Sequence, residues 1–268
     1  MTGTITFNGK PSTDFGIIVE QYPELTRGTR RGDAYQIAGR NGSYVYEDGT
    51  YNNYEQQYSI SIPETAGDVS SAPYLKTAEV AAWLLGSRGY CKLEDSFEPD
   101  CFRMARFSGS WNITQLIDRY GTAPISFECQ PERYLKTGET AVTALEGVHA
   151  LESVSYTLTN PTTFTARPLI KVTGYGGIQF SVTPDGDTAV AIQCSVGSTR
   201  TTFIIDCDSY SVTYEDGTDA SSIMTFVDTQ GYPSFPRLSP GDNIVANIPY
   251  NGGGYIEKLE IVPRWWKL

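Results

Sequence analysis

Hydrophobic and polar residues alternate with a period of two along much of this 268-residue chain, and this pattern constrains the fold more than any other feature. The alternation is clearest at residues 5–7, 58–62, 102–113, 125–129, 169–173, 178–182, 203–205, 212–214 and 256–262. Successive side chains of a strand point to opposite faces, so each segment predicts a strand with one buried face. Tight turns are predicted by Asn-Gly at 8–9, 41–42 and 251–252, and by Asp-Gly at 48–49, 185–186 and 216–217. The sequence therefore predicts an all-β, mainly antiparallel protein.

Only one segment, residues 73–85, has the pattern of a helix. Apolar residues recur along it at helical spacing, at Leu75, Ala78, Ala82 and Leu85. Ser71 is a candidate N-cap, Pro73 suits the first turn, and Gly86 follows as a stop signal. We expect a single helix packed against the first half of the chain.

The length suggests one large domain or two modest domains. Residues 137–152 have weak periodicity and lie between two strand-rich halves, so we place the domain boundary near the start of this region. The expected domains are 1–140, an N-terminal β domain with the helix, and 141–268, a C-terminal β-sandwich. The pentapeptide Tyr-Glu-Asp-Gly-Thr occurs at 46–50 and 214–218, and its surroundings are dissimilar, which indicates a repeated turn rather than a repeated domain.

The charge excludes several partners. The chain has 20 Lys and Arg against 31 Asp and Glu, a formal net charge of −11, and no basic cluster able to grip nucleic-acid phosphates. No apolar stretch approaches a membrane span, and the first residues do not resemble a secretory signal. The five cysteines are therefore interpreted as free thiols packed as small hydrophobes, with a Cys194–Cys207 disulfide left open.

Most catalytic templates fail because the necessary residues are missing. The single histidine, His149, lies in the expected linker, and no G-x-S-x-G, P-loop or zinc spacing is present. Asp185 with Asp187, and Asp206 with Asp208, are carboxylate pairs that could hydrolyse glycosides or hold calcium, although solvated surface residues are the favoured interpretation. We expect no catalytic residue, no metal and no cofactor.

The aromatic residues leave a carbohydrate-binding function open. Trp265 and Trp266 are candidate glycan contacts. They are consecutive and would face opposite sides of a strand, so at most one could line a given platform. Aromatic residues of β-sandwiches more often belong to cores or interfaces.

A series of short motifs, in a particular order, carries a resemblance. The motifs lie at residues 7–10, 14–19, 37–42, 46–53, 83–85, 160–162, 167–174, 238–243 and 262–266. Together they resemble the distal tail protein family of siphophages, a component of the tail-tip hub, over essentially the whole chain. Asn41 departs from this pattern, because an acidic residue is expected in its turn.

The resemblance implies a structural function. In that family a tail-tube-like N-terminal β-sandwich forms a ring, usually a hexamer, and the C-terminal domain is a galectin-like β-sandwich. The implied partners are other copies of the chain in one ring or two stacked rings, the tail tube protein, a tail-associated fibre or lysin protein, and receptor-binding proteins. The implied location is the virion tail tip, after assembly in the bacterial host cytoplasm. DNA would be passing cargo only, and an acidic wall would let it slide through.

The segment 27–53 is the expected ring interface. It combines the basic Arg27, Arg30 and Arg31 with the Gly-Arg-Asn-Gly turn and a tyrosine-rich hairpin, in which Tyr54 follows Tyr44, Tyr46 and Tyr51. The candidate interface residues are Arg30, Arg40, Asn41, Tyr46, Tyr51 and Asn53. Arg40 is expected to form charge-assisted hydrogen bonds with a neighbouring subunit. The alternatives are a plain solvated loop here, and a carbohydrate-binding protein or a glycoside hydrolase for the chain as a whole.

Overall fold

The structure is a computed structural model that describes residues 2–63, 73–109, 114–117, 120–228, 231–251 and 253–268. It divides into two compact units, Met1–Arg133 with Leu268, and Tyr134–Lys267. The sequence placed the boundary at residue 140, seven residues further along the chain. Each unit has its own cluster of buried hydrophobic side chains.

The first unit is built on one antiparallel sheet. Its elements are β1 (Ile5–Phe7), β2 (Lys10–Pro11), the 3-10 helix η1 (Ser12–Phe15), β3 (Ile18–Val19), β4 (Arg30–Gln36), β5 (Ser43–Tyr51), β6 (Tyr54–Pro63), α1 (Pro73–Leu85), β7 (Cys91–Asp95), β8 (Cys101–Phe107), β9 (Thr114–Ile117) and β10 (Tyr120–Leu135). The strand order is β2-β1-β7-β8-β10-β6-β3, and β9 pairs with β10. An isolated bridge between Gly3, just before β1, and Val19 of β3 connects the β3 end of this path to the β1 side, so the sheet curls back on itself.

Local sequence explains these elements. Asn8 and Gly9 both have positive φ, 51° and 75°, which is the hairpin turn predicted between β1 and β2. In β6 the alternating residues Tyr58, Ile60 and Ile62 are buried as predicted. Aliphatic and aromatic side chains share the interior, and a fully buried large side chain contributes about 1.5–3 kcal/mol.

Helix α1 (Pro73–Leu85) forms where the sequence predicts it, but with a different face inward. Val80, Trp83 and Leu84 are buried, whereas Ala78, Ala82 and Leu85 are exposed. The tryptophan decides the orientation, because it buries the largest apolar area and its Nε1–H donates to the carbonyl of Phe7 at 3.1 Å. Its ring also stacks on Phe15. The candidate cap Ser71 lies outside the described residues.

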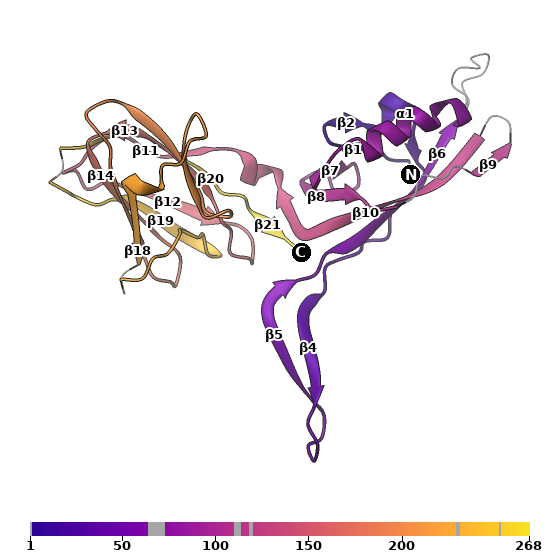
Figure 1. Ribbon diagram of the computed structural model, residues 1–268, viewed down its shortest axis with the longest axis horizontal. Coiled ribbons are helices and arrows are strands. Elements are labelled where there is room, and N and C mark those ends of the chain that lie inside the picture. The colour runs from indigo at the N-terminus through magenta and orange to yellow at the C-terminus, as the bar shows by residue number, and fades with distance from the viewer. Residues whose placement is uncertain (1, 64–72, 110–113, 118–119, 229–230, 252) are drawn as a thin grey trace. The chain divides into compact units, whose positions relative to one another are not determined.

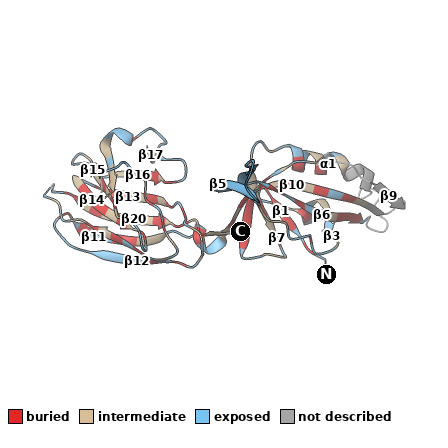
Figure 2. Ribbon diagram, turned by 90° about the horizontal axis from the view of Figure 1, so that it is seen from below, coloured by how far each residue is buried: buried red, intermediate tan, exposed pale blue. Residues whose placement is uncertain are grey.

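Strands β4 and β5 form a separate two-stranded hairpin that extends away from the sheet of the first unit (Figure 1). Every residue of β4 is exposed, and so is every residue of β5 except the last. Figure 2 shows β5 in the colour of exposed residues. The Asp-Gly at 48–49 was expected to be a turn, but it lies within β5, opposite a register shift in β4. The actual turn is at residues 37–42, between the two strands.

Both copies of the repeated pentapeptide have the same local geometry. In each, the Asp side chain accepts hydrogen bonds from the backbone N–H and the hydroxyl of the Thr two residues later. Gly49 and Gly217 take positive φ, 79° and 86°. The two copies thus share a local hydrogen-bond pattern, but only the copy at 214–218 forms the predicted turn, whereas the copy at 46–50 forms an irregularity inside β5.

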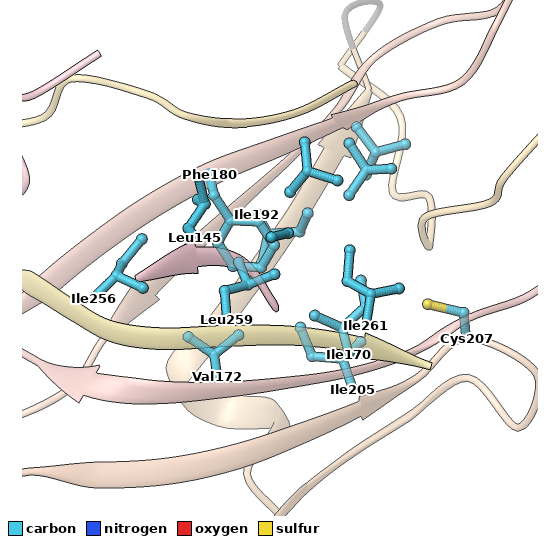
Figure 3. Close-up of a cluster of buried hydrophobic side chains, with 14 of the residues drawn as sticks. Leu145, Ile170, Val172, Phe180, Ile192, Ile205, Cys207, Ile256, Leu259 and Ile261 are labelled. Atoms are coloured by element: carbon cyan, nitrogen blue, oxygen red, sulfur yellow. The ribbon is translucent and has the colours of Figure 1, made fainter. Parts of the chain in front are cut away.

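The second unit is a sandwich of two five-stranded antiparallel sheets. Its elements are η3 (Lys136–Glu139), β11 (Val142–His149), β12 (Ser155–Asn160), β13 (Leu169–Tyr175), β14 (Gly177–Thr183), β15 (Val190–Ser195), β16 (Thr201–Asp206), β17 (Ser211–Tyr214), η4 (Ser221–Ile223), β18 (Met224–Asp228), β19 (Gly241–Asn247), β20 (Tyr255–Val262) and β21 (Trp266–Lys267). The sheet orders are β11-β20-β13-β16-β17 and β12-β19-β14-β15-β18, while β21 pairs with β10. Branched aliphatic side chains such as Ile170 and Ile261, with Phe180, fill the space between the sheets (Figure 3).

The prediction of an all-β, mainly antiparallel protein with one helix is confirmed for the described residues. The weakly periodic region 137–152 includes all of β11 and most of η3, so His149 ends a paired strand instead of lying in a linker. None of the helices in the described residues has the length and apolar run that a membrane crossing demands.

Candidate functional site

The β4–β5 hairpin presents tyrosines on one of its two faces. Tyr35 lies opposite Tyr44, and Asp33 lies opposite Tyr46, so these four side chains share one face. The three rings are 54%, 50% and 59% exposed, respectively. The Tyr35 hydroxyl donates to Asp33 at 3.3 Å. We call these four residues the tyrosine face.

The basic stretch at the start of the hairpin is largely neutralised. Arg30 Nη1 donates to Glu47 Oε2 at 3.0 Å, and its guanidinium lies 6.0 Å from the centre of the Tyr51 ring. Arg27 pairs with Glu98 at 3.4 Å. Arg31 borders a shallow surface hollow beside Asp48. Arg30 therefore braces the hairpin, and Arg27 is tied to Glu98 outside it.

The tip of the hairpin carries the predicted Arg40 and Asn41, both exposed. The Arg40 N–H donates to the carbonyl of Ile37 at 3.1 Å, and Gly39 and Gly42 both take positive φ. Among the described residues no ion pair engages the Arg40 guanidinium. The tip thus presents an available cation on a chain of net negative charge.

Asn53 lies at the base of the hairpin and belongs to a polar cluster on the sheet. Its Nδ2 donates to the Tyr90 hydroxyl at 2.7 Å and to Glu128 Oε1 at 2.8 Å. Glu128 also accepts from Arg106 Nη2 at 2.6 Å. Hydrogen bonds from Arg106, Tyr90 and Asn53 lower the pKa of the Glu128 carboxyl to about 2. This cluster links the chain segment after β5 to β8 and β10.

A second polar network is buried in the same unit. Asp95 Oδ2 accepts from Arg103 Nη1 at 2.6 Å and from the Tyr58 hydroxyl at 2.9 Å, while Oδ1 accepts from the N–H groups of Phe97 and Glu98. Glu98 pairs with Arg103 as well. Burial acts to raise the pKa of Asp95, but Arg103 and these hydrogen bonds outweigh it and hold the pKa below its ordinary value. The carboxylate is thus ionised in the interior.

Sequence reasoning missed both networks. Glu128, Arg106, Tyr90 and Asn53 come from four separate places in the chain, and Asp95 and Arg103 come from adjacent strands. The local sequence signal was the presence of charged residues at alternate positions of the strand segments. This signal does not show whether a given charge is buried. Tyr54, counted with the hairpin tyrosines from the sequence, is buried in the first unit.

The remaining candidates have structural surroundings. Trp265 is 5% exposed, so it offers no ring face to a sugar. Trp266 is half-buried, stacks on Phe164 and donates through Nε1 to the carbonyl of Thr165. The described residues contain no group of three or more His, Cys, Asp or Glu suited to a metal ion. All five cysteines are free thiols, including Cys194 and Cys207.

In each candidate carboxylate pair, at least one Asp is already bound to an arginine of the same unit. Asp206 ends β16, accepts from both Nη atoms of Arg264 at 2.7 and 3.1 Å, and caps the N–H groups of Asp208 and Ser209. Asp208 therefore lies in a turn after β16 and does not share a strand face with Asp206. Asp187 pairs with Arg237 and also caps its own turn at Thr188.

Comparison with known proteins shows a likeness of fold. No protein-family model matches the chain, and no curated protein sequence matches it. A crystal structure of the SPP1 Dit (gp 19.1) protein, described as a paradigm of the hub adsorption apparatus in phages that infect Gram-positive bacteria, is similar with a TM-score of 0.66 and 16% identity over 99% of both chains. A Cry1Da tryptic core variant from Bacillus thuringiensis is matched at a TM-score of 0.23 and 11% identity, over 98% of this chain and 51% of that one, which carries no argument. The chain therefore has the fold of the SPP1 Dit protein over 99% of its length.

Proposed function

We propose that this protein is a structural component of a bacteriophage tail tip, in which copies of the first unit form a hexameric hub ring. The observation that carries the proposal is the fold likeness to a phage hub protein, which spans 99% of both chains. The ring would join the tail tube protein to the tail-associated fibre or lysin protein and to receptor-binding proteins. Such a protein acts through its surfaces and needs no catalytic residue.

The hairpin is the part of the first unit that needs a neighbour. A two-stranded hairpin is marginally stable by itself in water, and this one leaves three tyrosine rings half exposed. Tyrosine is enriched at protein interfaces because its ring is apolar and its hydroxyl can hydrogen-bond. Contact with a second copy would bury the tyrosine face and order the hairpin.

Closed rings require two different patches on each subunit. In our proposal one patch is the tip half of the β4–β5 hairpin, where Tyr46, Arg40 and Asn41 contact the neighbour. Arg30, Tyr51 and Asn53 would act indirectly, because their contacts within the chain hold the hairpin at its base. Arg40 would pair with a carboxylate of the adjacent subunit, and the acidic chain offers many.

The charge is compatible with an opening that DNA crosses. Each copy carries a formal charge of −11. Acidic side chains along an opening would repel phosphates, so DNA would slide past without the counterion release that drives binding. A DNA mobility assay at low salt should detect no complex with the assembled protein.

The ring is tested by light scattering coupled to size exclusion, with negative-stain imaging. Six copies of 29.5 kDa give about 177 kDa and a six-fold ring. The Tyr46→Ser and Arg40→Ala variants should contain more monomer than the wild-type protein. The matched control is Tyr232→Ser, which removes a 64% exposed tyrosine of the second unit and should leave the ring intact.

Two results would contradict the proposal. One is a wild-type protein that stays monomeric at every accessible concentration and whose hairpin amides are unprotected from hydrogen exchange. The other is a ring in which Tyr46→Ser and Arg40→Ala behave like Tyr232→Ser, which would move the interface away from the hairpin.

A further inference from the structure

Three aromatic rings lie side by side across one end of a sheet in the second unit. Tyr255 of β20 pairs in register with His149 of β11 on one side and with Tyr175 of β13 on the other. The ring centres are 4.8 Å apart for His149 and Tyr255, and 5.5 Å apart for Tyr175 and Tyr255. We call these three residues the aromatic row.

The aromatic row is on the outer surface of the sandwich. His149 is exposed and Tyr175 is 38% exposed, while Tyr255 is half-buried between them. The inward neighbours Val148 and Ile256 are buried, which places the row on the opposite, solvent side. Gly147 takes a φ of 67°, and a Cβ at this position would lie 3.6 Å from the Tyr255 hydroxyl. The absence of a side chain at Gly147 therefore lets the Tyr255 ring pack against β11.

A charged pair stands next to the row. Arg200 directly precedes Thr201, which pairs with Gly174, so Arg200 adjoins Tyr175. Its guanidinium binds Glu257 through two hydrogen bonds, Nε to Oε2 at 2.5 Å and Nη2 to Oε1 at 3.0 Å. This pair leaves unused guanidinium N–H donors and carboxylate lone pairs facing solvent. The surface therefore combines ring faces with preoriented donors and acceptors.

The described β14 and β15 strands of the other sheet carry no such row of rings on their outer face. That face carries small and amide side chains at paired positions, including Ser181, Ala191, Gln179 and Gln193. The aromatic residue of β14, Phe180, points inward and is fully buried.

The chemistry of the row matches a sugar ring better than other ligands. Aromatic faces beside paired acidic and basic side chains can stack on the C–H face of a pyranose while hydrogen-bonding its vicinal hydroxyls. The nearby charges are predominantly acidic, with Glu146, Glu152 and Glu257 against Arg200 and Lys258. This excess of carboxylates disfavours a polyanion.

We propose that the aromatic row, with Arg200 and Glu257, binds a neutral glycan. Tyr175 is the stacking residue because its ring is the most accessible of the two tyrosines. Glu257 and Arg200 each keep their mutual hydrogen bonds and share their remaining donors and acceptors with sugar hydroxyls. Binding at this site is independent of ring assembly by the first unit, so each proposal can fail without the other.

The experiment is saturation-transfer difference NMR on the full-length protein. The probes are methyl α-D-glucopyranoside, methyl β-D-galactopyranoside and methyl N-acetyl-β-D-glucosaminide at millimolar concentration, with poly(glycerol phosphate) as the anionic comparison. At least one neutral glycoside should receive saturation. Tyr175→Ala should weaken its binding about tenfold, and Glu257→Gln should also weaken it.

Matched variants separate binding from folding. Tyr175→Phe retains the ring and should retain binding. Tyr232→Ala removes an exposed tyrosine elsewhere in the same unit and should have no effect. All variants should keep the wild-type circular dichroism spectrum and thermal midpoint. The proposal is overturned if no neutral glycoside is saturated, if only the polyanion binds, or if folded Tyr175→Ala binds as well as Tyr232→Ala.

Discussion

The buried ion pair between Arg103 and Asp95 should dominate the stability of the first unit. The exposed fractions of the two side chains are only 3% and 1%. Replacing Arg103 by Met keeps an unbranched apolar stem but leaves the Asp95 carboxylate without its cation. Breaking a buried pair by removing one partner costs about 3–5 kcal/mol, a large part of a typical domain stability of about 5–15 kcal/mol.

The same substitution should reverse the pH dependence of stability. In the wild type the pKa of folded Asp95 is below the unfolded value, so its stabilisation is present above about pH 4 and is lost as the pH falls through the folded pKa. Without Arg103, burial is the largest remaining influence and raises the folded pKa above the unfolded one. Protonation then favours the folded state, and Arg103→Met should become more stable as the pH is lowered from 7 towards about 5.

The assay is urea unfolding followed by hydrogen exchange of the β7 and β8 amides, which reports on the first unit alone. The control is Arg106→Met, the same substitution on the same strand, because Arg106 is 55% exposed in its pair with Glu128. The control should leave the midpoint nearly unchanged. Asp95→Asn in the Arg103→Met background should restore part of the loss. The reasoning is refuted if Arg103→Met matches Arg106→Met, or if its loss does not depend on pH.

Three further predictions concern other parts of the chain. A thiol reagent should label only the half-buried Cys91 in the native protein and all five cysteines in urea, since burial raises the pKa of Cys194 to about 12; native labelling of a second thiol would contradict this. The Glu128 carboxyl should titrate near 2 by NMR and move upward in Arg106→Met, and a wild-type midpoint near 4.5 would show that the cluster does not form. Gly254→Ala should lower the thermal midpoint sharply because its new carbon would lie 1.9 Å from the Gly177 carbonyl oxygen, whereas Gly197→Ala, in open space, should change little; equal midpoints would argue against this close approach.

Strand segments were predictable where one face alternates strictly between apolar and polar residues. In β14, Ile178, Phe180 and Val182 point inward and the residues between them are half-exposed, as their period of two requires. The turn at Asn8–Gly9 was predictable for a similarly local reason, because few residue pairs accept two positive φ angles. These features depend on a few neighbouring residues.

The helix shows that a local sequence pattern can predict an element without predicting which of its faces is buried. Residues 73–85 form α1 as the sequence predicts, but the buried face contains Trp83 and Val80 rather than Ala78 and Ala82. Small alanines tolerate either environment, whereas the indole needs both an apolar contact and a hydrogen-bond acceptor, and Phe7 supplies both. That acceptor comes from a strand 76 residues away in the sequence.

The candidate site divides in the same way. The sequence alone identified the segment 27–53 as a tyrosine-rich hairpin with a Gly-Arg-Asn-Gly turn, and the turn at 37–42 and the exposure of Tyr46 agree with it. It could not show that Asp48–Gly49 lies inside a strand, or that Asn53 bonds to Glu128 and Tyr90. Both depend on which strands become neighbours.

By itself, the sequence determined the all-β class, the single α-helix of the described residues, the strands with strict alternation, several turns, and the resemblance to a phage tail family. Tertiary structure alone decided which charges are buried in pairs, which face of the helix is inward, and which aromatic rings remain exposed on the second unit. The physical reason is the distance along the chain over which each interaction acts. Backbone propensity and alternation act over a few residues, whereas burial and hydrogen bonding depend on strand pairing between residues that are distant in the chain.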